Sequence, residues 1–128
     1  PPWLKLIGWK SRGEIKDLLL SSDCALVPSI CREAFGLAWA EAMATRLPVI
    51  ASDAPGPLEY ITHNVDGLLF PKGDSAALAD LIEMLMKDGS LRERIADAGF
   101  RMVNSKLKWS VSAAETLAAV KKTRPSAL

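Results

Sequence analysis

The 128-residue sequence predicts an α/β fold in which a parallel sheet of about four strands is flanked by helices. The first observation is that short apolar runs, stopped by proline or glycine, alternate with longer amphipathic segments. The second is the composition, because 49% hydrophobic and 24% charged residues are typical of a soluble globular protein. The length suits a single domain, residues 1–128.

The predicted strands lie at residues 3–8, 23–28, 48–52 and 65–70. The second, DCALVP, is interpreted as a buried strand because its apolar run is short, continuous and stopped by Pro28. The fourth is a short strand that follows a turn at Asp66-Gly67.

The predicted helices carry recognisable start signals. Ser11 and Glu14 match a capping box at the start of the first helix, which places apolar residues on one face. Pro57 suits the first position of a short helix, and Asp74 is a suitable N-cap for a longer one. The later helices are predicted at residues 36–46, 57–61, 75–87, 91–103 and 110–122.

Charge and cysteine content exclude several classes of function. Sixteen basic and fifteen acidic residues give a net charge of +1 without a basic patch, so no nucleic-acid partner is predicted. No apolar run could span a membrane, and a cytoplasmic location is expected, at the inner face of the membrane as an alternative. Cys24 and Cys31 are predicted to be reduced and buried, and their spacing suits neither a metal site nor thiol catalysis.

The loops after the predicted strands form the candidate ligand site, since parallel sheets bind ligands beyond the carboxyl ends of their strands. They lie at residues 8–10, 29–35 and 53–56, and the second leads directly into the helix that begins at Gly36. A helix N-terminus offers free backbone N–H groups and a partial positive charge, and a glycine there lets a ligand approach closely. The sequence therefore predicts an anion site, with phosphate as the commonest anion.

Two glutamates flank this predicted anion site. Glu33 lies just before the helix, and Glu41 lies roughly 7 to 8 Å beyond its start. Carboxylates accept hydrogen bonds from hydroxyl groups, so the pair would suit a molecule with hydroxyls at both ends and phosphate in the middle, such as a nucleoside-diphosphate sugar. Alternatively, both are ordinary solvated glutamates. Glu41 favours the first interpretation, because it is the only acid in a helix of alanine, leucine, tryptophan and methionine.

These residues are part of a longer pattern that resembles a known family. EAFGLAWAE, from Glu33 to Glu41, is similar to the E-x7-E motif of retaining GT-B glycosyltransferases of the family 4, or group 1, type. EAMATRLPVIASDAPGPLEYI and VDGLLFPKGDSAALADLIEMLMKD resemble two further segments of that family. The resemblance covers about residues 6–115 and implies a partial Rossmann-like sheet, the nucleotide-sugar donor domain of such an enzyme.

The resemblance also implies roles for individual residues. Glu33 would be the catalytic residue, in contact with the hydroxyls of the donor sugar, and Glu41 would bind the ribose hydroxyls. The other implied contacts are Ala34, Phe35, Gly36 and Leu37 with the donor, and Gly8, Trp9 and Lys10 with the base. No metal or other cofactor is implied, because protein donors would neutralise the departing diphosphate, and the glycosyl group would be transferred with retention.

Three positions depart from the family pattern. Ala34 and Pro55 stand where the family has glycine, and Arg46-Leu47 replaces the glycine step after the helix, which is expected to end without a glycine C-cap. The family also has two further β–α units at the start of this domain, the first with an Arg and a Lys for the diphosphate, and a preceding acceptor domain.

We expect this chain to lack those parts and to be inactive in transfer by itself. The acceptor, a glycan, lipid or small molecule, would bind to the missing domain, as in bacterial polysaccharide synthesis. The absent strands would lie between residues 3–8 and 23–28, so an exposed sheet edge or self-association is expected.

Two other classes of function remain open from the sequence. A non-catalytic nucleotide-binding or assembly module would keep the fold without transfer, and a purely structural domain would bind no nucleotide. His63 is interpreted as a surface turn residue, Glu59 either as a helix acid or as part of the donor pocket, and Trp39 and Met43 as core partners.

Overall fold

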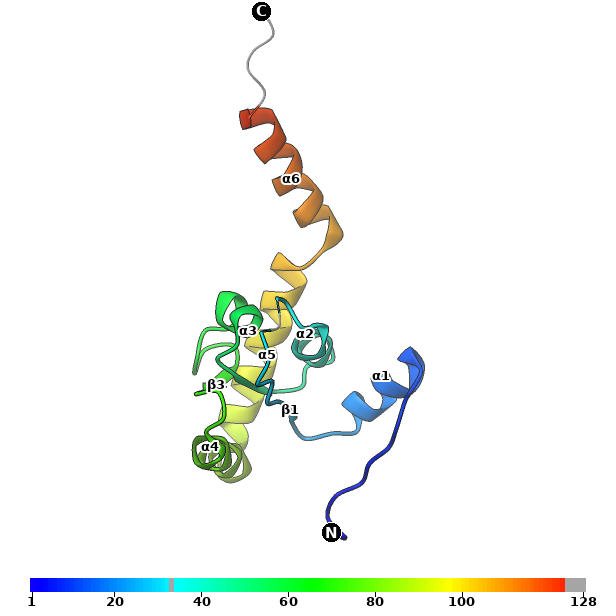
Figure 1. Ribbon diagram of the computed structural model, residues 1–128, viewed down its shortest axis with the longest axis vertical. Coiled ribbons are helices and arrows are strands. Elements are labelled where there is room, and N and C mark those ends of the chain that lie inside the picture. Colours follow the sequence, from blue (N-terminus) through cyan, green and yellow to red (C-terminus); the bar gives the residue numbers. More distant parts are fainter. Residues whose placement is uncertain (33, 124–128) are drawn as a thin grey trace, which may run out of the picture.

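The computed structural model describes residues 1–32 and 34–123 (Figure 1). It is a mixed α/β fold, as the sequence predicts. The elements are α1 (Arg12–Leu20), β1 (Ala25–Val27), α2 (Leu37–Ala44), β2 (Val49–Ser52), α3 (Pro55–Tyr60), β3 (Leu68–Phe70), α4 (Ser75–Lys87), α5 (Gly89–Lys106) and α6 (Trp109–Thr123). Within those ranges, no helix combines the length and the apolar character that crossing a membrane requires.

The sheet is parallel, with three strands in the order β1-β2-β3. Ala25 of β1 pairs with Val49 of β2, and Ile50 of β2 pairs with Leu68 of β3. The central strand β2 is buried along its whole length, which explains its uninterrupted run of small and apolar residues. Because the strands are parallel, their carboxyl termini lie at the same end of the sheet. The loops that follow the strands therefore lie on one side of the domain.

The strand expected at residues 3–8 is absent from the described part of the chain. Its side chains are exposed, with Leu6 92% accessible, and Figure 1 shows this segment running apart from the sheet. A strand is stable only where its backbone groups find partners and one of its faces packs on a core. The segment has neither here, and β1 is therefore an edge strand of the sheet.

Successive residues of β2 point to opposite faces of the sheet and enter two hydrophobic clusters. One cluster joins α2 and the end of α5 to the sheet, through Trp39, Ala42, Met43, Val49, Ala51 and Met102. The other joins α4 and the start of α5 to the opposite face, through Ile50, Leu68, Phe70, Leu85 and Ile95. The prediction that Trp39 and Met43 belong to the core is confirmed.

Two predicted helix starts, at Ser11 and at Asp74, are confirmed by side-chain caps. The Ser11 hydroxyl accepts a hydrogen bond from the Glu14 N–H (3.4 Å), and the Glu14 carboxylate accepts one from the Ser11 N–H (2.9 Å). Asp74 caps α4 by accepting from the Ala77 N–H (2.9 Å). The short helix α3 begins at Pro55, two residues before the predicted start at Pro57. Both prolines lie in its first turn, where a missing N–H costs no helical hydrogen bond.

Helix α2 ends without glycine, as expected, and Arg46 takes the glycine's place. Arg46 has a left-handed backbone, with φ of 58°. Its N–H donates to the Met43 carbonyl (3.0 Å), and the Leu47 N–H donates to the Ala42 carbonyl (3.1 Å), which together form a Schellman motif. The guanidinium lies 3.2 Å from the Asp97 carboxylate of α5, so the strained residue also links the two helices.

The helices α1 and α6 are less embedded than the others. No residue of α1 is buried, although Leu19 packs against the first cluster. Figure 1 shows α1 standing beside the body formed by α2 to α5, and α6 extending from the end of α5 away from the sheet.

Candidate functional site

Helix α2 has one buried face and one open face. Trp39, Ala40, Ala42 and Met43 are buried, whereas Leu37, Ala38, Glu41 and Ala44 are exposed. No hydrogen bond or ion pair joins the Glu41 carboxylate to another described residue. This carboxylate is therefore open to a ligand, as a ribose-binding role would require.

The N-terminus of α2 is also open. Gly36 is the N-cap residue, and its φ of 74° lies in the left-handed region that favours glycine. Without a side chain, Gly36 cannot cap the helix, and Leu37 in the first turn is 65% exposed. The uncapped N–H groups of this turn offer hydrogen bonds and a partial positive charge to an anion.

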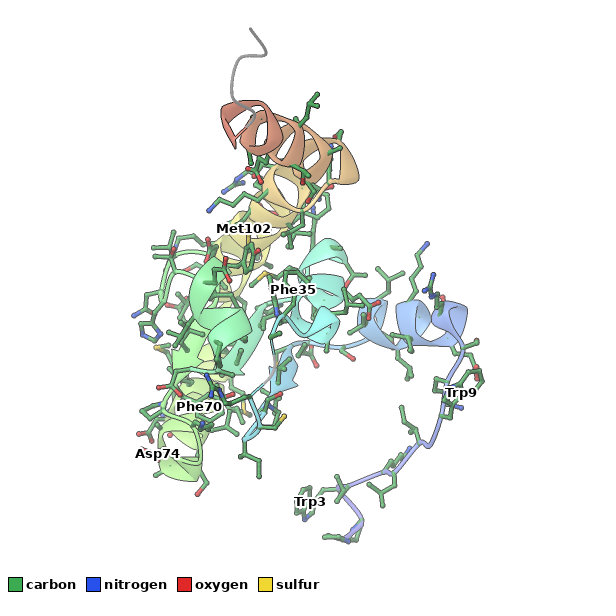
Figure 2. The ribbon with its side chains drawn as sticks, turned by 45° about the horizontal axis from the view of Figure 1, so that its top comes forward. Trp3, Trp9, Phe35, Phe70, Asp74 and Met102 are labelled. Carbon is green, nitrogen blue, oxygen red and sulfur yellow. The ribbon has the colours of Figure 1, made fainter. Side chains whose placement is uncertain are left out.

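The loop that leads into α2 is held from behind by aromatic side chains. The Trp39 indole N–H donates to the Phe35 carbonyl (2.7 Å). The rings of Phe35, Trp39 and Tyr60 lie in mutual contact, with centroids 5.1 to 5.6 Å apart. Figure 2 shows Phe35 at the centre of the molecule, at the start of α2. This cluster fixes the direction in which the first turn of α2 presents its N–H groups.

Gly56 completes the support of this loop. A Cβ at Gly56 would lie 2.1 Å from the Phe35 carbonyl oxygen, so only glycine allows α3 to approach the loop this closely. The sequence predicts that the 53–56 loop lies among the candidate ligand loops, but its pattern does not reveal this contact. The nearest signal was the similarity of the Pro55-Gly56 step to a family glycine pair.

Two hydrogen bonds join the loops at the carboxyl ends of the strands. The buried Ser52 hydroxyl, at the end of β2, donates to the Ser29 carbonyl after β1 (2.7 Å). The Asp53 carboxylate accepts from the Lys72 N–H after β3 (2.7 Å). The three loops at the carboxyl ends of the strands are therefore connected to one another.

Two hollows flank Glu41. The first, here called the α1–α2 pocket, has a volume of about 330 Å³ and is lined by Arg12, Ile15, Lys16, Leu19, Glu41, Ala44 and Thr45. The second, the α2–α5 groove, has a volume of about 430 Å³ and is lined by Phe35, Leu37, Ala40, Glu41, Ala44, Tyr60, Val103, Leu107 and Ser112. The structure thus brings Phe35, Leu37 and Glu41 together around one surface, as the sequence predicts.

Five predicted site residues remain, namely Glu33, Ala34, Gly8, Trp9 and Lys10. Glu33 lies outside the described residues. Gly8, Trp9 and Lys10 line neither hollow beside Glu41. Trp9 is 88% exposed, Figure 2 shows it far from Phe35, and Lys10 pairs with Glu14 (3.3 Å). Ala34 is exposed next to the site.

The side chains of His63 and Glu59 are exposed, as expected for a turn histidine and a helix acid. The His63 Nδ1 accepts a hydrogen bond from the Leu69 N–H (2.9 Å), which gives this histidine a structural contact at the start of β3.

The two cysteines are free thiols in different environments. Cys24 is half-buried, and desolvation, followed by the charge of Asp23, raises the pKa of its thiol. The prediction that Cys31 is buried is wrong, because this residue lies in the loop beyond β1 and its side chain is exposed.

Known proteins show the same sequence pattern. The family described as glycosyl transferases group 1 matches residues 3–102. A phosphatidyl-myo-inositol mannosyltransferase of Mycobacterium leprae is 40% identical over 97 residues, which cover 76% of this chain and 26% of that protein. The chain spans about a quarter of the length of the curated relatives it matches.

Solved structures show the same fold. HepE of Anabaena, in a crystal structure with UDP and glucose, is similar with a TM-score of 0.81 and 29% identity, over 90% of this chain and 32% of HepE. The C-terminal domain of the group 1 glycosyl transferase LpcC from Francisella tularensis has a TM-score of 0.73 and 33% identity, over 83% of this chain and 53% of that one. The chain therefore belongs to the group 1 glycosyl transferases, in which it corresponds to the C-terminal domain of the GT-B fold.

Proposed function

We propose that this chain binds a nucleoside-diphosphate sugar and supplies the donor site for glycosyl transfer with retention of the anomeric configuration. One observation carries the proposal. At the N-terminus of the short helix α2 no described side chain caps the N–H groups, and the Glu41 carboxylate, on the same open face, has no described side-chain partner. Support comes from the family match and from HepE, a relative solved with UDP and glucose.

The donor would lie along α2 with its phosphates at the N-terminus. The N–H groups of the first turn would donate to the diphosphate, and the helix dipole would favour its negative charge. As the glycosyl bond breaks, charge develops on the leaving diphosphate, and donors already aimed at that position stabilise the transition state. In this proposal neither a metal nor another cofactor is needed for leaving-group stabilisation.

The two glutamates would hold the ends of the donor. Glu41 would accept hydrogen bonds from the ribose hydroxyls, because a carboxylate has two oxygens for two O–H donors. Glu33 would contact the hydroxyls of the sugar near the reacting carbon, and the loop of Ala34, Phe35 and Gly36 would close the site between them. The acceptor, a glycan, a lipid or a small molecule, would be bound by another domain of a longer cytoplasmic protein, in polysaccharide or glycolipid synthesis.

A nucleotide titration tests the donor site. We expect the tryptophan fluorescence of the chain to change saturably with UDP, GDP or ADP. Glu41→Ala should weaken the preferred nucleotide by about 1–3 kcal/mol, because two charge-assisted hydrogen bonds are lost. Glu93→Ala, an exposed glutamate of α5, is the matched control and should bind as the wild type does. Binding that survives Glu41→Ala unchanged would contradict the proposed role of this residue.

The edge strand β1 adds a second part to the proposal. Leu26 at its centre is 44% exposed, and an uncovered parallel edge can pair with another chain. We therefore infer self-association through β1 as a property of this chain in solution.

A further inference from the structure

The α1–α2 pocket contains charged side chains to which the proposed donor site assigns no role. Arg12 and Lys16 of α1 and Glu41 of α2 line the same hollow. None of the three side chains takes part in a hydrogen bond or an ion pair with a described residue. Lys10, which lies just before α1, is different, because its ammonium is already paired with the Glu14 carboxylate (3.3 Å). The pocket therefore has two cations whose donors are available to a ligand.

The position of the pocket along α2 indicates which end of the donor it would take. The residues that α2 contributes are Glu41, Ala44 and Thr45, which all lie at or beyond Glu41 as seen from Gly36. The diphosphate of the proposed donor lies at Gly36, in the opposite direction. A donor whose ribose is held by Glu41 would therefore extend its base into this pocket.

The size and lining of the pocket suit a nucleobase. Its volume of about 330 Å³ is at the lower end of the range of about 300–1,000 Å³ for small-ligand sites, which is room for one end of a nucleotide sugar. Ile15 and Leu19 offer an apolar wall for the face of a base. Arg12 and Lys16 supply its charged donors, and neither side chain can accept a hydrogen bond.

Bases differ in what they present to such donors. Guanine carries the O6 carbonyl and thymine, like uracil, the O4 carbonyl, whereas adenine carries an amino donor at the corresponding position. We propose that Arg12 and Lys16 donate to the carbonyl oxygen of a uracil or guanine base in the α1–α2 pocket, and so exclude adenine nucleotides. The inference rests on the proposed function, in which Glu41 binds the ribose. It assigns base recognition to α1 itself, and not to Gly8, Trp9 and Lys10.

The test compares three nucleotides on variants of the full chain. UDP, GDP and ADP are titrated by calorimetry into the wild type and into the double variant Arg12→Met and Lys16→Met. Methionine removes the charge but keeps an unbranched apolar stem. Arg101→Met is the control, because Arg101 is an exposed arginine of α5 that lines neither hollow beside Glu41. Circular dichroism checks that each variant keeps its helices.

We expect the wild type to bind UDP or GDP at least about tenfold more tightly than ADP. The difference corresponds to one charged hydrogen bond that adenine does not form. The double variant should bind that preferred nucleotide about tenfold or more weakly and ADP almost as well as the wild type does, while Arg101→Met should change neither affinity. Equal losses for all three nucleotides would overturn the inference, because the cations would then contact the phosphates. Unchanged binding would overturn it too. Either result leaves the proposed donor site standing if Glu41→Ala still weakens nucleotide binding, whereas a wild type that binds no nucleotide overturns both proposals.

Discussion

At the scale of single residues, Gly56 connects the fold to the site. Its α-carbon faces the backbone of Phe35, and an added methyl group would overlap the Phe35 carbonyl oxygen at 2.1 Å. Because this neighbour is backbone, it cannot turn away as a flexible side chain would. The shape of the loop before α2 therefore depends on a residue that lies far along the chain and has no side chain.

We predict that Gly56→Ala lowers the free energy of unfolding by about 1–3 kcal/mol, through overpacking against the Phe35 backbone. Urea unfolding followed by circular dichroism measures the change. Gly13→Ala in α1 is the control, because a Cβ at Gly13 meets no atom within 4 Å. That variant should be neutral or more stable by up to about 1 kcal/mol. Equal stability of the Gly56→Ala variant and the wild type would contradict the prediction, because it would show that the loop moves aside without loss of stability.

At the scale of elements, the N-cap of α5 has a pH-dependent contribution. The Asp88 carboxylate accepts hydrogen bonds from the Leu91 N–H (2.9 Å) and from the Ser90 hydroxyl (2.7 Å). These bonds, the Leu91 one first, hold the pKa of Asp88 below its ordinary value. A lowered folded-state pKa means that the charged carboxylate stabilises the fold above the ordinary aspartate range, and that this stabilisation is lost as the pH falls through the folded pKa.

We predict that Asp88→Asn, which keeps a capping oxygen but cannot ionise, makes stability less sensitive to acid below about pH 4. Unfolding midpoints in urea between about pH 2 and 7 measure this dependence. Asp80→Asn on the exposed face of α4 is the control and should keep the acid dependence of the wild type. The cap would have no electrostatic role if both variants lost stability in parallel with the wild type.

At the scale of the whole molecule, the proposed self-association depends on the free edge of β1. We predict that sedimentation velocity shows a mass that rises with protein concentration. Leu26→Lys should shift this equilibrium towards the monomer, because a lysine on an edge strand opposes pairing with another chain. Leu58→Lys on α3 is the control, since Leu58 is also exposed but lies away from the sheet edge. Association that both variants weaken equally would indicate general hydrophobic attraction.

Local signals allowed most of the fold to be predicted. The caps at Ser11 and Asp74 and the apolar run of β2 each specify their element within a few neighbouring residues. Residues 3–8 carry a similar apolar run but form no strand, because a strand also needs a partner that its own sequence does not encode.

The candidate site could also be predicted only in part. The open position of Glu41 follows from the spacing of residues along one helix, and the structure agrees with it. The contacts of Phe35 with Tyr60 and with Gly56 join segments far apart in the chain, and no periodicity reveals them. The pocket between α1 and α2 depends on how two helices lie relative to each other, which explains why Arg12 and Lys16 were not among the predicted site residues.

The separation of α2 into a buried and an open face has a consequence for protein engineering. The packing that anchors this helix is carried by Trp39, Ala42 and Met43, and none of these side chains faces the solvent. Leu37 and Ala38 are exposed beside Glu41, so a combinatorial library at those two positions should tolerate many substitutions without unfolding. Directed evolution of a donor preference could therefore begin on this face of α2, with the anchoring residues left as they are.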